Sequence, residues 1–89
     1  MTPSDNAIRA ALLDLALERG AGKTYCPSDA ARRLSPDWRA LMPDIRRVAT
    51  QMQRDGLLQA TQAGQKVDPD RAKGPIRLGL PTGQGRAPS

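Results

Sequence analysis

The sequence predicts a small α+β domain, mainly α with a small β-hairpin, in which three main helices precede a two- or three-stranded antiparallel wing. One observation is an amphipathic helix at residues 43–56 whose outward side is basic. Another is a pair of alternating apolar segments, residues 57–62 and 75–80, separated by a basic connection rich in turn formers. This order is typical of a winged helix-turn-helix. The domain is expected to span residues 1–80, and residues 81–89, rich in Gly and Pro, to form a disordered C-terminal tail.

Composition limits the chain to one small domain. It has 89 residues, a net charge of +5, one Trp, one Tyr and no Phe, so Leu, Ile, Val, Ala and Met must build the core. Such a core leaves a thin margin of stability, which a homodimer or another partner would increase. No apolar run approaches the roughly 20 residues of a membrane span, and the N-terminus lacks the order of a secretory signal. We therefore expect a cytoplasmic protein without a membrane partner.

The first helix is expected to start at a cap, Thr2 or Ser4, and to run to about Arg19 before a terminating glycine. Its apolar positions are Ile8, Leu12, Leu13, Leu15, Ala16 and Leu17. So wide an arc favours a central helix packed against both a helical pair and a small sheet. The alternative is a dimer surface made by Leu13 and Leu17.

Residues 23–26 are expected to add a short strand to a sheet edge, and residues 27–29 to start a short second helix that includes Leu34. Residues 35–42 then predict a separate helical turn, which Pro43 ends by restarting the chain. Within that turn, Trp38 is interpreted as the main anchor that fixes the turn in the core. A base or a partner's pocket is the alternative contact for its ring.

The helix at residues 43–56 is the predicted recognition helix. Its apolar stripe consists of Ile45, Val48, Ala49 and Met52. Arg47, Thr50 and Arg54 occupy the centre of the opposite side, which carries no acid between Asp44 and Asp55. Such a surface suits a polyanion.

Several segments resemble an uncharacterised bacterial family, domain of unknown function 3253: CPSDAARRL, PDWRALMPDIRRVA, and VDPDRAKGPIRLGLP following DGLLQATQAGQ. The likeness covers about residues 25–81 and implies a winged-helix fold. It implies no catalytic residue, because the family has no assigned activity.

Catalytic chemistry is poorly supplied. The sequence has no His and no Ser near a plausible base, so we expect no enzyme activity and no cofactor. Asp68 and Asp70 flank a proline in a predicted turn without the third carboxylate of a calcium loop, so no metal is expected. Cys26 is interpreted as a small core residue, with a redox-sensitive thiol as the alternative.

Duplex DNA is the partner that these residues favour. The candidate DNA-binding residues are Arg39, Arg46, Arg47, Thr50, Gln51, Arg54, Lys66, Arg71 and Lys73. Arginine pairs with phosphate or guanine and Gln with adenine, so the helix would enter the major groove while the loop at residues 63–74 contacts the backbone. The leading hypothesis is thus a small DNA-binding winged-helix protein, such as a transcription regulator. The alternative is a winged-helix protein interaction module, or basic residues that are merely solvated.

Overall fold

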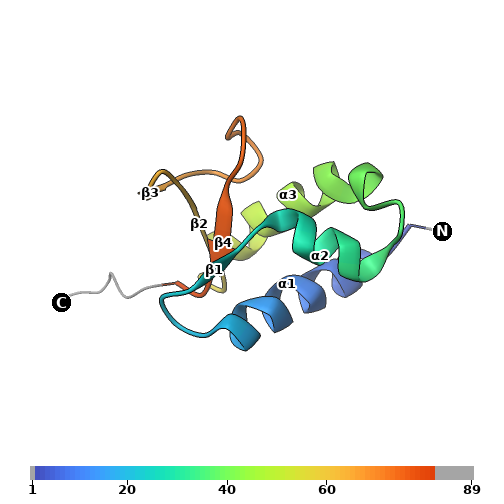
Figure 1. Cartoon of the computed structure of the whole chain (residues 1–89), viewed down its shortest axis with the longest axis horizontal. Coiled ribbons are helices and arrows are strands. Elements are labelled where there is room, and N and C mark those ends of the chain that lie inside the picture. The colour runs from blue at the N-terminus through green and yellow to red at the C-terminus, as the bar shows by residue number, and fades with distance from the viewer. Residues whose placement is uncertain (1, 82–89) are drawn as a thin grey trace.

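A computed structural model describes residues 2–81, which contain three helices and a four-stranded antiparallel sheet (Figure 1). In chain order the elements are α1 (Asp5–Arg19), β1 (Thr24–Tyr25), α2 (Pro27–Leu34), α3 (Trp38–Arg54), β2 (Gln59–Gln62), β3 (Gln65–Lys66) and β4 (Arg77–Gly79). The helices form a bundle and the sheet lies at one end of it. The predicted α+β winged-helix layout is confirmed. The tail predicted after residue 81 lies outside the described residues.

The central helix α1 begins and ends as its sequence predicts. Ser4 is its N-cap and accepts a hydrogen bond from the N–H of Ala7 at 3.1 Å, while Gly20 ends the helix with a φ of 88° and donates its N–H to the carbonyl of Ala16. The helix contacts α2, α3, β1 and β4. The interpretation of α1 as packed between helices and sheet is therefore confirmed, although Leu17 remains 59% exposed.

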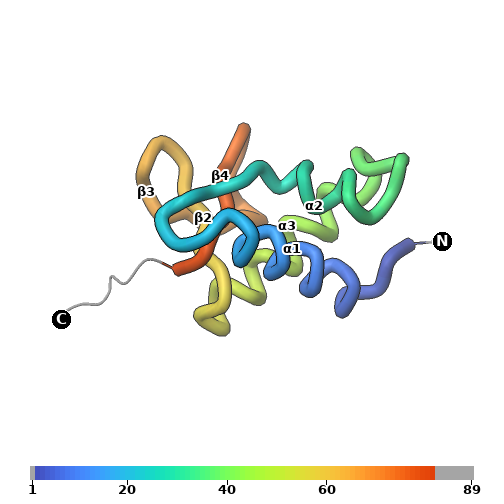
Figure 2. The backbone as a smooth tube through the Cα atoms, turned by 60° about the horizontal axis from the view of Figure 1, so that its bottom comes forward, coloured from blue at the N-terminus to red at the C-terminus, as the bar shows by residue number. Residues whose placement is uncertain are grey.

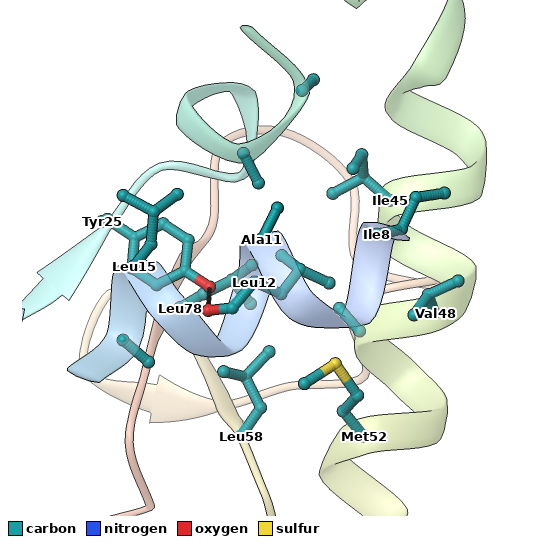
Figure 3. Packing of buried hydrophobic residues seen from close by; sticks show 14 of the residues in the cluster. Ile8, Ala11, Leu12, Leu15, Tyr25, Ile45, Val48, Met52, Leu58 and Leu78 are labelled. Atoms are coloured by element: carbon teal, nitrogen blue, oxygen red, sulfur yellow. Dashed lines mark hydrogen bonds between the residues drawn. The ribbon is translucent and has the colours of Figure 1, made fainter. Parts of the chain in front are cut away.

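The largest fully buried side chain in the described residues is Tyr25 of β1, which the sequence analysis treated only as part of a strand. Its hydroxyl donates a hydrogen bond to the carbonyl of Leu12 at 2.6 Å (Figure 3). Burial raises the pKa of this hydroxyl, with a smaller contribution from the carboxylate of Asp29. Figure 3 also shows Ile8 of α1 close to Ile45 of α3, so one core joins helices and sheet.

The start of α3 corrects one prediction. Residues 38–42 do not form a separate turn before Pro43; they are the first residues of one continuous 17-residue helix, with Pro43 inside it. Proline at the sixth helical position removes only one backbone donor. Buried residues from Leu41 to Met52 lie on both sides of Pro43 in the sequence and form one apolar stripe. The burial of this stripe stabilises the continuous helix. Trp38 is half-buried at the first helical position and packs against the core from its edge.

The sheet order is β1-β4-β2-β3, with every pair antiparallel. Leu78 of β4 stands between Tyr25 and Ala60, and these three buried residues form the inner face. The predicted strands are confirmed as β1, at an edge of the sheet, β2 and β4. Strand β3 was not predicted; it pairs with β2 through a tight turn in which Ala63 and Gly64 both have positive φ angles, 51° and 80°. Figure 2 shows this hairpin extending away from the helices.

A candidate nucleic-acid interface

The chain between β3 and β4, residues 67–76, does not project as a free loop. We call it the wing connection. Arg46 of α3 donates hydrogen bonds to three of its carbonyls, those of Pro69 at 3.2 Å, Ala72 at 2.8 Å and Gly74 at 2.9 Å. One guanidinium thus satisfies three backbone acceptors that have no strand partner. Arg46, predicted to contact DNA, is committed to holding the wing connection against α3.

Thr50 supplies a second attachment and corrects a second prediction. It is only 7% exposed, because the wing connection covers the part of α3 that a helical wheel places at the outward centre. Its hydroxyl donates to the carboxylate of Asp68 at 2.8 Å and accepts the N–H of Asp70 at 3.0 Å. The Thr50 hydrogen bond, followed by that from the Asp70 N–H, lowers the pKa of Asp68 below its ordinary value. Thr50 therefore holds the wing connection, and its predicted place on the open side of α3 is wrong.

Two glutamines complete the attachment. Gln53 of α3 donates to the carbonyl of Val67 at 2.9 Å and accepts the N–H of Ala60 at 2.6 Å. Gln62 of β2 donates to the carbonyls of Lys73 and Pro75 at 2.6 and 3.1 Å. Together with Arg46 and Thr50, these amides fix the backbone of the wing connection at both of its ends.

Arg47 is exposed in part but already paired. Its guanidinium donates to both carboxylate oxygens of Asp5 at 3.0 and 2.8 Å, and to Asp44 at 3.4 Å. The Arg47 hydrogen bonds lower the pKa of Asp5, and the same contacts raise the pKa of Arg47. The pair connects α3 to the start of α1, a contact that a wheel drawn for one helix cannot predict.

The remaining candidates are exposed. Within residues 2–81, Arg39, Gln51 and Arg54 of α3 have exposed side chains, and Arg39 and Arg54 form no ion pair. Lys66 and Lys73 are likewise exposed and unpaired in this part of the chain. Arg71, whose side chain is 88% exposed, lies 3.9 Å from Asp68. These six are the predicted site residues that a ligand can still reach.

A cationic contact that the sequence analysis missed lies where α2 meets α3. The guanidinium carbon of Arg32 is 4.5 Å from the centroid of the Trp38 ring, and that of Arg39 is 4.4 Å away. Arg32 is exposed and forms no ion pair among the described residues. The sequence signal was a tryptophan with one arginine directly after it and another six residues before it. A single helical turn cannot bring both arginines to the ring, but two helices that meet at the tryptophan can.

No other chemistry gathers in the described part of the chain. It contains no group of three or more His, Cys, Asp or Glu residues placed to hold a metal ion. Cys26 is half-buried at the N-cap of α2, where its sulfur accepts a hydrogen bond from the Ser28 hydroxyl at 3.1 Å. None of the helices described is long and apolar enough to cross a membrane.

Residues 5–81 match the family described as "Protein of unknown function (DUF3253)". The chain belongs to this family. The match extends the resemblance noted in the sequence by the whole of α1, so it covers every helix and strand of the fold. A comparison with curated proteins finds no match for this chain.

Proposed function

We propose that this member of the family binds double-stranded DNA through the exposed side of α3 and the adjacent wing. The observation that carries the proposal is that Arg39 and Arg54 lie on one side of α3, free of ion pairs among the described residues, beside a wing connection that bears Lys73. Unpaired cations on a helix and on a neighbouring loop are the contacts that phosphate groups require.

The dimensions of α3 suit this role. Fifteen residues separate Arg39 from Arg54, which at the helical rise of 1.5 Å per residue is about 22 Å. At 100° per residue the two positions differ by about 60° around the helix axis, so they share one side of it. Gln51 lies next to that side and is the exposed amide available for a base edge.

The contact set is smaller than the sequence predicts. Arg46 and Thr50 support the proposed interface by holding the wing connection, and Arg47 supports it by fixing α3 to α1 through Asp5. Arg39, Arg54, Lys66 and Lys73 then remain as phosphate contacts. Four contacts predict a salt dependence with a slope of about −3.6, so affinity should fall about 150-fold between 50 and 200 mM salt.

The test is fluorescence anisotropy of a labelled mixed-sequence duplex at these two salt concentrations. Wild-type protein is expected to bind at low salt, and R54Q should weaken binding and reduce the slope by about one. The matched control is R33Q, since Arg33 is exposed but is held by both carboxylate oxygens of Glu18 at 2.8 and 3.0 Å. Absence of binding at 50 mM salt, or equal effects of R54Q and R33Q, would contradict the proposal.

A protein interaction module is the second candidate, because two large apolar side chains within residues 2–81 are exposed. Leu17 at the end of α1 is 59% exposed and Leu57 after α3 is 38% exposed. A partner held by these residues should be lost in L17E and retained in R54Q, whereas DNA binding should show the reverse. Sedimentation of the protein alone would reveal whether that partner is a second copy.

A further inference from the structure

We infer that Arg32 and Arg39, stacked on Trp38, form a clamp for the phosphodiester backbone at the corner between α2 and α3. This site rests on the proposed DNA binding and extends it from α3 to a second helix. Arg32 is outside the set of residues that the sequence predicts for the interface.

The geometry of the stack leaves the arginine donors available. Both guanidinium carbons lie within 4.5 Å of the same ring centroid. At that distance the positive charge of the guanidinium is attracted to the face of the ring, and this attraction does not use up its N–H donors. Within residues 2–81 neither arginine uses these donors in a hydrogen bond or ion pair, and neither pairs with Asp37, the carboxylate that precedes the ring.

The contact with the ring also reduces the entropic cost of binding. A free arginine loses much of its rotamer freedom when a ligand fixes it. Trp38 is half-buried and packs against the core, so it provides a firm surface on which two flexible side chains are already placed. Two guanidiniums held in this way can bind one anionic group between them, or two successive ones.

The spacing fits a nucleic-acid strand. Because both carbons are close to one centroid, their separation is at most the sum of the two distances, about 9 Å. Charges on one DNA strand follow one another at about 3.4 Å along the helix axis, so one or two neighbouring phosphates fall within the reach of both forks. Because both guanidinium carbons already lie over the ring, Trp38 acts in this site as their support.

A purely structural role makes a different prediction. If the arginines only shield the indole from water, removing one lowers stability and leaves the salt dependence of DNA binding unchanged. In a phosphate clamp, each arginine neutralises a phosphate and so contributes to the number of counterions that are released on binding. Replacing either one should lower the magnitude of the salt slope by about one and weaken binding about tenfold at 50 mM salt.

The experiment compares R32Q, R39Q and the neighbouring control R33Q with wild type, by anisotropy of a labelled mixed-sequence 20-base-pair duplex at about 50 and 200 mM salt. Arg33 follows Arg32 on the same helix and loses the same charge, but its donors are held by Glu18. R32Q and R39Q are expected to lose affinity and slope, and R33Q to bind like wild type. The control is thermal unfolding of each variant, which should show that every variant is folded at the temperature of the binding measurement.

The only tryptophan in the chain gives a second readout. Saturating duplex should reduce quenching of Trp38 emission by acrylamide, because the strand would cover the corner. If R54Q and R39Q weaken binding while R32Q does not, or if Trp38 is quenched equally with and without duplex, the clamp is refuted and the proposed DNA binding stands. If wild type fails to bind at 50 mM salt, both are refuted.

Discussion

Replacing Arg46 by Met should release the wing connection from α3 while leaving the helical core intact. Methionine is similar in length and apolar, so it keeps the packing of the side-chain stem but has no donor. Three carbonyls of the wing connection, those of Pro69, Ala72 and Gly74, would lose their partner. The prediction therefore concerns local opening of one segment and not unfolding of the domain.

The magnitude follows from the environment of the three hydrogen bonds. The bonds to Pro69 and Ala72 are part-buried, and the bond to Gly74 is exposed. An exposed bond is readily replaced by water, so it contributes little. Each part-buried bond contributes about 1 kcal/mol after exchange with water, which gives about 2 kcal/mol in total. The open form of the wing connection should become about 30-fold more populated.

Native-state hydrogen exchange measures this change directly. The amide of Asp70 donates to Thr50 and that of Ala72 to the carbonyl of Asp68, so both report on the wing connection. Their exchange should accelerate about 30-fold in R46M, the factor estimated from the two part-buried bonds. R54M is the control, because Arg54 is exposed on the same helix. Unchanged exchange at Asp70 and Ala72 would refute the attachment, and equal acceleration throughout α1 would show that Arg46 supports the whole fold.

Three further predictions concern stability. Y25F should lower the free energy of unfolding by about 1 kcal/mol and the melting temperature by about 4–8 °C, because the carbonyl of Leu12 loses the tyrosine hydroxyl but keeps its helical hydrogen bond. An unchanged melting temperature would show that the 2.6 Å hydrogen bond contributes nothing to stability. Asp68 has a lowered pKa, so its stabilising effect is present above the ordinary value of 3.8 and is lost as the pH falls through the lowered value. Acidification from pH 5 to 2.5 should therefore cost wild type more stability than D68N, measured by chemical unfolding, and parallel losses would exclude Asp68 as a source. P43A should raise the free energy of unfolding by about 1–2 kcal/mol. The restored backbone donor stabilises the helix, and this gain exceeds the loss that comes from a less restricted unfolded chain. Urea unfolding measures the change, and a lower midpoint would mean that the proline ring makes a stabilising contact.

Local patterns predicted the elements because local chemistry determines them. The cap at Ser4, the glycine that ends α1 and the alternation in β4 each act within a few residues. The predicted start of α3 at Pro43 was wrong. The rule that proline ends a helix considers the one backbone hydrogen bond that is lost, but it does not include the burial of apolar residues before and after the proline. Strand β3 was not predicted because its two residues, Gln65 and Lys66, are exposed and show no apolar alternation. Their pairing with β2 depends on the turn before them.

The candidate site was less predictable for the same reason. A helical wheel ranks residues by their angle from the core of one helix, and it assigns every polar position opposite that core to solvent. In this protein a second layer, the wing connection, lies on part of that polar side, so Arg46, Thr50 and Gln53 bind backbone groups that are distant in the sequence. The carbonyl of Pro69 is 23 residues from Arg46, the N–H of Asp70 is 20 residues from Thr50, and the carbonyl of Val67 is 14 residues from Gln53.

That layer changes what a basic helix indicates about function. An arginine that donates to the wing connection no longer offers its charge to a ligand, whereas Arg39 and Arg54, which form no ion pair within residues 2–81, still do. The number of arginines on α3 therefore overstates the phosphate contacts it can make, and the salt slope measures the difference. With the four contacts counted above, a slope of about −3.6 would fit the wing connection remaining in place on DNA, and the added contact of Arg32 in the clamp would bring it to about −4.5. A clearly steeper slope in wild type that R46M reduces would mean that Arg46 leaves the wing carbonyls to bind phosphate, and that the wing connection detaches from α3 when DNA binds.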